Sequence, residues 1–278
     1  MNTVPKVTLN NGVEIPQLGF GVFKVDPTAT VRIVTEAIEV GYRHIDTAEM
    51  YGNEAEVGEA IRRSGLGRDA FFVTSKLNNN FRTFDAARSA FDGTLAALDI
   101  GQIDLFLIHW PLSTVRDFVV VWKALERAYA EGRARSIGVS NFTIDHLSRL
   151  FDESDVVPAV NQVEVHPYFA QNDLLAFHTA HHLATEAWAP LAQGAILGDP
   201  RIAKIAEAHG RSVAQVTLRW HVQRGSIVFP KSSNPARMRE NFAIFDFELA
   251  PDEMDTISGL DRHGRVGSDP ATFDDVAR

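Results

Sequence analysis

Residues 41–58 read GYRHIDTAEMYGNEAEVG, and this stretch decides the interpretation of the chain. A short apolar run, Tyr42–Ile45, is typical of a buried strand and leads directly to Asp46. Tyr51 follows in the next few residues. A carboxylate and a phenol placed just beyond a strand are candidates for proton-transfer chemistry.

Two further strand-like runs also end in polar groups. Phe71–Ser75 is followed by Lys76, and Ile103–Ile108 is followed by His109. Taken singly, each polar residue has an ordinary interpretation, such as a helix cap or turn for an aspartate. Taken together at consecutive strand ends, Asp46, Tyr51, Lys76 and His109 favour a catalytic site, because enzymes built on parallel barrels place their chemistry there.

The composition indicates a globular protein. The chain has 278 residues, 45% hydrophobic and 23% charged, and it contains no cysteine, which excludes disulfides and thiol chemistry. The formal net charge of −9 argues against nucleic acid as a partner. No run approaches the roughly 20 apolar residues of a membrane span, and the N-terminus lacks the apolar core of a signal peptide. We therefore expect a cytoplasmic protein without a membrane partner.

Strand-like and helix-like patterns alternate along the whole chain. The predicted strands start near Leu18, Arg43, Phe71, Ile103, Ala134, Ala159, Ala184 and Ile227. The segments between them are predicted helices, for example Thr28–Val40, Phe84–Leu98 and Phe118–Tyr129. The longest gap has room for two helices, Arg201–His209 and Val213–Gln223. Eight such units predict a closed (β/α)8 barrel formed by residues 1–278 as a single domain.

Both ends of the chain depart from this alternation. The N-terminal segment VTLNNGVEI predicts a β-hairpin that turns at Asn10-Asn11-Gly12. The last residues, Arg262–Arg278, are polar and without a clear period, so we expect a C-terminal loop.

The motifs resemble those of the aldo-keto reductase superfamily. Residues 41–58 are similar to its signature GYRHIDTAxxYxNExxxG, and residues 95–111, LAALDIGQIDLFLIHWP, to LxxLxxxYxDLxxxHxP. Residues 229–241, FPKSSNPARMREN, resemble PKSxxxxRxxEN. Gln102, or the residue beside it, replaces the usual tyrosine at a position expected to be structural. Motifs and loop lengths are most similar to bacterial reductases of the 2,5-diketo-D-gluconate type. The resemblance implies a barrel whose bottom is plugged by the N-terminal hairpin.

The resemblance also implies the role of each catalytic residue. Reduction of a carbonyl builds negative charge on its oxygen, and Tyr51 would supply the proton. An ordinary phenol has a pKa of about 10, so the ammonium of Lys76 would make Tyr51 more acidic. Asp46 would orient Lys76, and His109 would orient the substrate carbonyl by a hydrogen bond.

No GxGxxG motif exists, so a Rossmann dinucleotide site is not indicated. By resemblance, Lys231, Ser232 and Arg237 would bind the 2′-phosphate of NADPH, and Glu240 and Asn241 its adenine. NADPH is favoured over NADH, which remains a secondary cofactor. The alternative is a solvated basic helix without a ligand.

The nicotinamide half of the cofactor has its own predicted residues. By resemblance, Ser140, Asn141 and Gln162 would bind the carboxamide, and Trp188 would stack on the ring. Backbone groups of Leu191, Gln193 and Gly194 would contact the pyrophosphate. For the Trp188 ring, the alternative is ordinary core packing.

Five residues form the predicted substrate pocket: Phe23, Tyr51, His109, Trp110 and Asn141. The loop after His109 and the C-terminal segment are both short, which predicts an open pocket and relaxed specificity. We expect a monomeric, NADPH-dependent reductase of aldehydes and activated ketones, such as 2-oxoaldehydes, diketones and keto sugars including 2,5-diketo-D-gluconate.

Two alternatives remain open. A protein with this fold could retain the cofactor site as a regulatory or sensor subunit with little turnover. A barrel metallohydrolase is the other alternative, since His178, His181 and His182 have a spacing that places them on one helix face. No HExxH motif accompanies these histidines, so a solvated or partly packed histidine cluster is the preferred interpretation.

Overall fold

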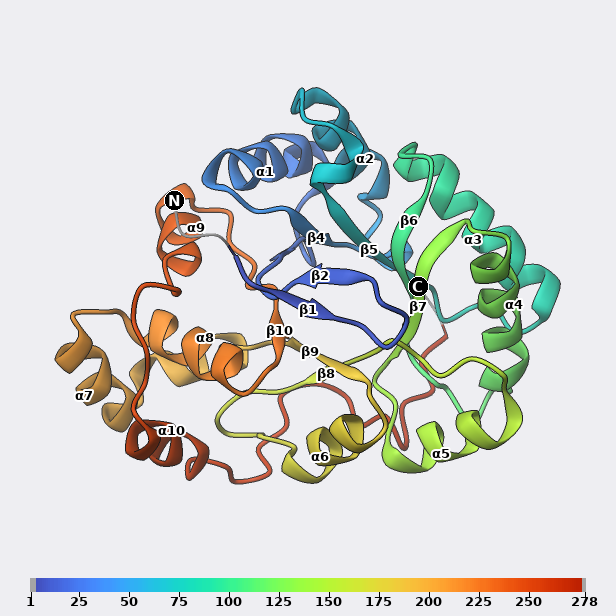
Figure 1. Ribbon diagram of the computed structural model, residues 1–278. Coiled ribbons are helices and arrows are strands. Elements are labelled where there is room, and N and C mark those ends of the chain that lie inside the picture. The colour runs from blue at the N-terminus through green and yellow to red at the C-terminus, as the bar shows by residue number, and fades with distance from the viewer. Residues whose placement is uncertain (1–3, 277–278) are drawn as a thin grey trace.

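The computed structural model describes residues 4–276, in which strands and helices alternate (Figure 1). The strands are β1 (Lys6–Thr8), β2 (Glu14–Pro16), β3 (Phe20–Gly21), β4 (His44–Asp46), β5 (Phe72–Leu77), β6 (Ile103–Ile108), β7 (Ala134–Ser140), β8 (Val160–Glu164), β9 (Ala184–Trp188) and β10 (Ile227–Val228). The helices are α1 (Pro27–Val40), α2 (Glu54–Arg63), α3 (Phe84–Leu98), α4 (Phe118–Ala130), α5 (Ile144–Glu153), α6 (Asn172–Ala180), α7 (Pro200–His209), α8 (Val213–Gln223), α9 (Pro235–Phe242) and α10 (Pro251–Ser258). Short 3-10 segments are η1 (Glu49–Tyr51), η2 (Arg68–Ala70) and η3 (Ala192–Gly198).

Strands β3 to β10 form one parallel sheet of eight strands in chain order. Leu18, just before β3, pairs in parallel with Val228 of β10. The backbone N–H of Gly19 donates to the Val228 carbonyl at 2.8 Å, and the Val228 N–H donates to Gln17 at 3.0 Å. These bonds join the first and last strands, and helices surround the sheet (Figure 1). The predicted (β/α)8 barrel is confirmed.

The helix ends follow from local sequence signals. Asp26 caps α1 by accepting a hydrogen bond from the Thr28 N–H, and Pro27 occupies the first turn, where its missing N–H costs nothing. Gly41 ends the helix with a φ of 126°, a conformation that favours glycine. The predicted helices at Phe84–Leu98 and Val213–Gln223 have the observed bounds of α3 and α8.

The barrel strands are buried on both faces because helices cover one face and the core fills the other. All six residues of β6 are buried, which explains its nearly continuous apolar sequence IDLFLI. Lys76 departs from the prediction, because it lies inside β5 and not after it. The parallel register pairs Lys76 with Leu107 and Leu77 with Ile108, so the ladder continues for one residue beyond the lysine.

The N-terminal hairpin closes one end of the barrel. Strands β1 and β2 pair antiparallel, with Val7 opposite Ile15, and lie across the barrel opening in Figure 1. The side-chain amide of Asn11 donates to the Arg135 carbonyl at 3.0 Å, and that of Asn10 donates to Pro158 at 3.0 Å. These acceptors lie at the starts of β7 and β8, so the predicted plug is on the face opposite the strand ends that carry the polar residues.

The C-terminal loop is confirmed for residues 262–276, which contain no helix or strand. In the described part of the chain, no helix has the length and apolar character needed to cross a membrane.

Candidate active site

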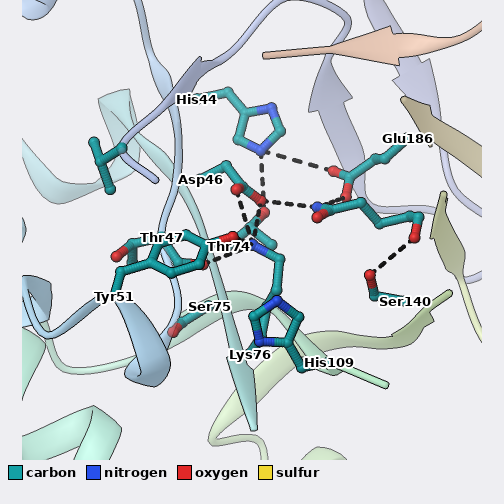
Figure 2. A network of polar contacts seen from close by, with 12 residues as sticks. His44, Asp46, Thr47, Tyr51, Thr74, Ser75, Lys76, His109, Ser140 and Glu186 are labelled. Carbon is teal, nitrogen blue, oxygen red and sulfur yellow. Dashed lines mark hydrogen bonds and ion pairs between the residues drawn. The ribbon is translucent and has the colours of Figure 1, made fainter. Parts of the chain in front are cut away.

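Asp46, Tyr51, Lys76 and His109 meet at the carboxyl ends of the strands (Figure 2). The ammonium of Lys76 donates to Oδ1 and Oδ2 of Asp46 at 2.8 and 2.9 Å and to the Thr47 carbonyl at 2.8 Å. Its Nζ lies 3.4 Å from the Tyr51 hydroxyl oxygen. The rings of Tyr51 and His109 have centroids 5.8 Å apart. The structure therefore assembles the four residues that the sequence predicts.

A tight turn brings Tyr51 over the end of β5. The 3-10 segment η1 begins after Ala48 and ends at Gly52, whose φ of 65° favours glycine. The loop is anchored by buried Asn53, which accepts from the Thr47 hydroxyl at 2.9 Å and donates to the Val22 carbonyl at 3.2 Å. Because both ends of the turn are fixed, the Tyr51 hydroxyl is held near Lys76.

Burial and charge act on these groups in opposite directions. Burial alone would lower the pKa of Lys76, but Asp46 and Tyr51 outweigh it and raise that pKa, so the ammonium stays charged. Burial raises the pKa of Tyr51 more than Lys76 lowers it. The expectation of a phenol more acidic than usual is therefore wrong for the protein alone, because desolvation of the phenolate is the larger effect. Tyr51 is therefore held as a neutral phenol.

His109 is neutral in this environment. Burial first, and then the charges of Lys76 and Arg116, lower its pKa well below the usual value. Its Nδ1 atom has no hydrogen-bond partner among residues 4–276. A neutral imidazole carries one N–H donor and one acceptor, so His109 retains a donor for a carbonyl oxygen.

The residues predicted to bind the cofactor carboxamide lie beside Asp46, Tyr51, Lys76 and His109, which we call the tetrad. The Ser140 hydroxyl donates to the Gln162 carbonyl at 2.9 Å, and the Asn141 amide donates to the His109 carbonyl at 3.0 Å. Asn141 also accepts from the Trp188 indole at 2.8 Å. The three predicted residues Ser140, Asn141 and Gln162 are thus in contact with one another, and Trp188 is oriented by one of them.

The segment after Trp188 has an unusual backbone. Ala189, Ala192 and Gln193 have φ values of 49°, 48° and 53°, and Gly194 has 96°. Gln193 and Gly194 are exposed, whereas Leu191 is half-buried against the core. Leu191 has a φ of −103° and a ψ of 20°, and Ala192 follows it with a φ of 48°. A right-handed residue followed by a left-handed one turns successive backbone N–H groups toward one side, which is the arrangement of an anion-binding nest. This geometry fits the predicted contact of Leu191 and Gln193 with a pyrophosphate, whereas the Gly194 N–H already donates to the Leu191 carbonyl at 2.8 Å.

Two exposed cations flank the start of α9. The side chains of Lys231 and Arg237 make no hydrogen bond or ion pair with any residue of the described range 4–276. Asn234 caps the helix by accepting from the Ala236 N–H at 2.8 Å, and buried Ser232 accepts from the Asn234 N–H at 3.1 Å. A helix start beside two unpaired cations suits a phosphate monoester. Glu240 is half-buried and Asn241 is buried on the same helix.

Comparison with known proteins decides the family. Residues 17–262 match the model of the "Aldo/keto reductase family". The chain belongs to the aldo/keto reductase family. It is 48% identical to a morphine 6-dehydrogenase of Pseudomonas putida, over 97% of this chain and 96% of the relative. It is 43% identical to the methylglyoxal reductase DkgA of Yersinia pestis, over 98% of this chain and 99% of the relative.

Solved structures of similar proteins have the same fold. A mutant of Gox0644 in complex with NADPH superimposes with a TM-score of 0.94, at 43% identity and with coverage of 98% of this chain and 99% of that chain. The apo form of Gox0644 has the same TM-score of 0.94 and covers 97% of this chain and 98% of that chain. This aldo-keto reductase is therefore an oxidoreductase with the barrel of its relatives.

Aromatic side chains lie beside Tyr51 and His109 in this reductase, and one of them, Phe273, was not predicted from the sequence. Phe23 is 51% exposed and its ring lies 5.0 Å from that of Tyr51. Trp110 packs against Phe273 of the C-terminal segment, with ring centroids 4.2 Å apart. The Glu164 carboxylate accepts hydrogen bonds from the Val266 and Gly267 N–H groups, so the segment is also tied to β8. The short tail thus covers Trp110, and the expectation of an open mouth is wrong on that side.

Arg116 is a second residue that the sequence did not single out. Its buried guanidinium donates to the carbonyls of Phe81 at 2.8 Å and Trp110 at 2.5 Å, with longer bonds to Asn78 and Pro111. It therefore joins the loop after β5 to the loop after His109. An arginine close to HWP in the sequence was the available signal.

Glu186 and His44 complete the polar interior of the barrel. Both are fully buried, and Gln162 lies between Glu186 and Asp46, donating to each of these carboxyl groups at 2.8 Å. The sequence assigned Gln162 to the cofactor and did not predict these bonds. A charged residue two positions before Trp188 in a buried strand was the signal, since alternate residues share a face.

The histidines of the hydrolase alternative do not share a helix face. Helix α6 ends at Ala180, so His181 and His182 lie beyond it, and His182 has a φ of 58°. The expectation that their spacing places all three on one helix face is therefore wrong. His178 is buried, with ring nitrogens 2.9 Å from the Asn161 amide and 2.8 Å from the Thr185 hydroxyl. Among the described residues, no group of three or more side chains could hold a metal ion.

A cavity of about 460 Å³ lies next to the site, between the starts of α5 and α6 and the C-terminal segment. Asn141 is at its edge, and Glu164, Asp261 and Arg265 also line it. The tetrad residues do not line this cavity. The candidate active site is therefore identified by the hydrogen-bonded tetrad and not by this cavity.

Proposed function

We propose that this aldo-keto reductase uses NADPH to reduce aldehydes and activated ketones to alcohols, with Tyr51 as the proton donor. The observation that carries the proposal is the position of one ammonium, that of Lys76, which is bonded to Asp46 and lies 3.4 Å from the Tyr51 hydroxyl. A buried cation next to a phenol serves proton transfer, because it stabilises the phenolate that remains after the proton has left.

NADPH supplies the hydride to the carbonyl carbon when it is bound. The protein supplies the proton, which moves from the Tyr51 hydroxyl to the carbonyl oxygen. The neutral His109 donates a hydrogen bond to the same oxygen and orients it. Lys76 stabilises the resulting phenolate, and Asp46 keeps Lys76 charged and in place. Burial of these groups strengthens each electrostatic contact.

Several features of the chain support NADPH as the cofactor. Lys231 and Arg237 are exposed and unpaired within residues 4–276, as a 2′-phosphate site requires. Ser232, Glu240 and Asn241 complete this end of the proposed site. Trp188 would stack on the nicotinamide, while Ser140, Asn141 and Gln162 would bind its carboxamide. The Gox0644 mutant, with 43% identity, binds NADPH.

We propose small, electrophilic carbonyl compounds as substrates, namely 2-oxoaldehydes, diketones and keto sugars such as 2,5-diketo-D-gluconate. The relative of Yersinia pestis is a methylglyoxal reductase. Phe23, Trp110 and Asn141 would form the pocket around Tyr51 and His109. Aromatic walls with few polar groups are typical of sites for small molecules. A single domain, a monomeric state and a cytoplasmic location remain predictions.

The decisive test compares the wild type with Tyr51→Phe. Turnover is followed by the loss of reduced-nicotinamide absorbance with methylglyoxal, diketones and keto sugars, and NADH is run in parallel. We expect turnover with NADPH preferred, and a loss of about 10²–10⁴-fold in kcat for Tyr51→Phe with NADPH binding retained. NADPH binding by the wild type without turnover on any carbonyl would favour the sensor alternative. Failure to bind NADPH would reject the cofactor assignment.

A further inference from the structure

The inside of the barrel holds a second acid that the proposed chemistry does not use. Glu186 lies on β9, is fully buried and faces Asp46 across the barrel (Figure 2). One side chain connects the two acids. The Gln162 amide nitrogen donates to Asp46 Oδ2 at 2.8 Å and to Glu186 Oε2 at 2.8 Å.

These two bonds determine the orientation of the Gln162 amide. A primary amide has two N–H donors on its nitrogen and an acceptor oxygen. Asp46 and Glu186 take both N–H groups, so none remains for another partner. The opposite orientation would place the amide oxygen against two carboxyl oxygens, which repel it. The amide oxygen itself has no hydrogen-bond donor among residues 4–276.

The two acids carry different charges. Asp46 has the Lys76 ammonium on both of its oxygens and is the carboxyl that holds the negative charge. Glu186 has no cation in contact with it within the described chain. Burial, together with the Asp46 charge, raises the pKa of Glu186 to about 8.

His44 faces the remaining oxygen of Glu186. Its Nδ1 lies 3.3 Å from the Pro16 carbonyl and carries the hydrogen, because a carbonyl only accepts. Its Nε2 is therefore an acceptor, 3.0 Å from the Thr74 hydroxyl and 3.8 Å from Glu186 Oε1. Burial lowers the pKa of His44 to about 3, so the ring is neutral. The Thr74 hydroxyl donates to this acceptor, and the 3.8 Å to Glu186 Oε1 is too long for a hydrogen bond, so Glu186 Oε1 has no hydrogen-bond partner among residues 4–276.

We propose that Glu186 is a positioning residue for the cofactor: it and Asp46 hold both amide hydrogens of Gln162, so that the Gln162 oxygen is presented to the carboxamide N–H of NADPH. The inference rests on the proposed function. It also gives the Asp46 of the tetrad a role in holding the nicotinamide, because the same carboxylate contacts Lys76 and Gln162.

The test uses a cofactor without the carboxamide N–H. In the reduced 3-acetylpyridine analogue of NADPH a methyl ketone replaces the amide, so it cannot donate to Gln162. Dissociation constants of NADPH, this analogue and adenosine 2′,5′-bisphosphate are measured by calorimetry for the wild type, Glu186→Met and Glu186→Gln. Methionine has a similar length but no acceptor oxygen, whereas glutamine keeps an acceptor oxygen for Gln162.

We expect the wild type to bind NADPH about threefold to tenfold more tightly than the analogue, which is the effect of one hydrogen bond. In Glu186→Met the ratio of the dissociation constant of the analogue to that of NADPH falls toward one, and in Glu186→Gln this ratio is retained. Binding of the bisphosphate, which has no nicotinamide, stays the same in all three proteins and reports that the barrel is folded.

Three results would overturn the proposal: a ratio of one in the wild type, an unchanged ratio in a Glu186→Met protein that binds the bisphosphate normally, or a lost ratio in Glu186→Gln. The last result decides the matter even if Glu186→Met does not fold. All three leave the proposed function intact, since that function fails only if the wild type does not bind NADPH or does not reduce carbonyls.

Discussion

Lys76 and Asp46 form an ion pair inside the barrel, with Nζ 2.8 Å from Oδ1 and side-chain exposures of 0% and 3%. Charges removed from water in this way are stable only when each keeps its partner and its other hydrogen bonds. The pair therefore links the stability of the barrel to the arrangement of its active site.

Removal of one partner should strongly destabilise the protein. We expect Asp46→Asn and Lys76→Met each to lower the free energy of unfolding by about 3–5 kcal/mol, because an uncompensated buried charge remains. The double variant should lose less than the sum of the two, since it contains no unpaired charge. Urea unfolding gives the free energies of unfolding of the wild type, the two single variants and the double variant. Additive losses would show that the two charges do not stabilise each other.

Glu186 should make stability depend on pH. Its pKa is raised from 4.5 to about 8 on folding, so the folded state binds its proton more tightly than the unfolded state does. The stabilisation of the folded state by protonated Glu186 is complete below pH 4.5 and is lost as the pH rises toward 8. Glu186→Gln cannot lose a proton there. The free energy of unfolding of Glu186→Gln should therefore rise relative to that of the wild type, by on the order of a few kcal/mol between these two pH values.

Unfolding free energies of the wild type and Glu186→Gln, measured from pH 5 to pH 8 at constant ionic strength, test this expectation. Parallel curves for the two proteins would mean that Glu186 has the same proton affinity in the folded and unfolded states.

The cations at α9 should set the preference between cofactors. We expect Lys231→Met and Arg237→Met each to weaken NADPH binding by about tenfold, the effect of a lost charge-assisted hydrogen bond, and to leave NADH binding unchanged. Arg239→Met is the matched control, because Arg239 is another exposed arginine of the same helix. Fluorescence titration with both cofactors provides the constants. Equal weakening of NADH would argue against a 2′-phosphate site.

Gly267 should be needed for the position of Trp188. A Cβ atom at residue 267 would overlap the Trp188 ring and lie 2.9 Å from Glu164 Oε2. Gly267→Ala therefore requires the ring or the C-terminal segment to move, and we expect weaker NADPH binding with binding of adenosine 2′,5′-bisphosphate unchanged. Gly264→Ala is the control, since its nearest atoms lie at 3.3 Å and include the flexible Arg262 side chain. Equal affinities in both variants would show that Trp188 is not held by this contact.

Much of this architecture could be predicted from the chain alone. Apolar runs and caps give the strand order and the bounds of α3 and α8, because these signals are local. Parallel strands bring their carboxyl ends to one face, and that rule alone places Asp46, Lys76 and His109 near each other. The strand that carries Lys76 was predicted to end at Ser75 but ends two residues later, at Leu77, because the end of a ladder depends on the neighbouring strand.

The sequence by itself determined the barrel, the tetrad and the family. The tertiary structure alone decided that Gln162 joins Asp46 to Glu186, that Phe273 covers Trp110, and that burial outweighs Lys76 in setting the pKa of Tyr51. The physical reason is distance along the chain. Residues 46, 162 and 186 come from three different strands, and no local pattern states which side chains meet once the sheet has closed, or how much water remains around them.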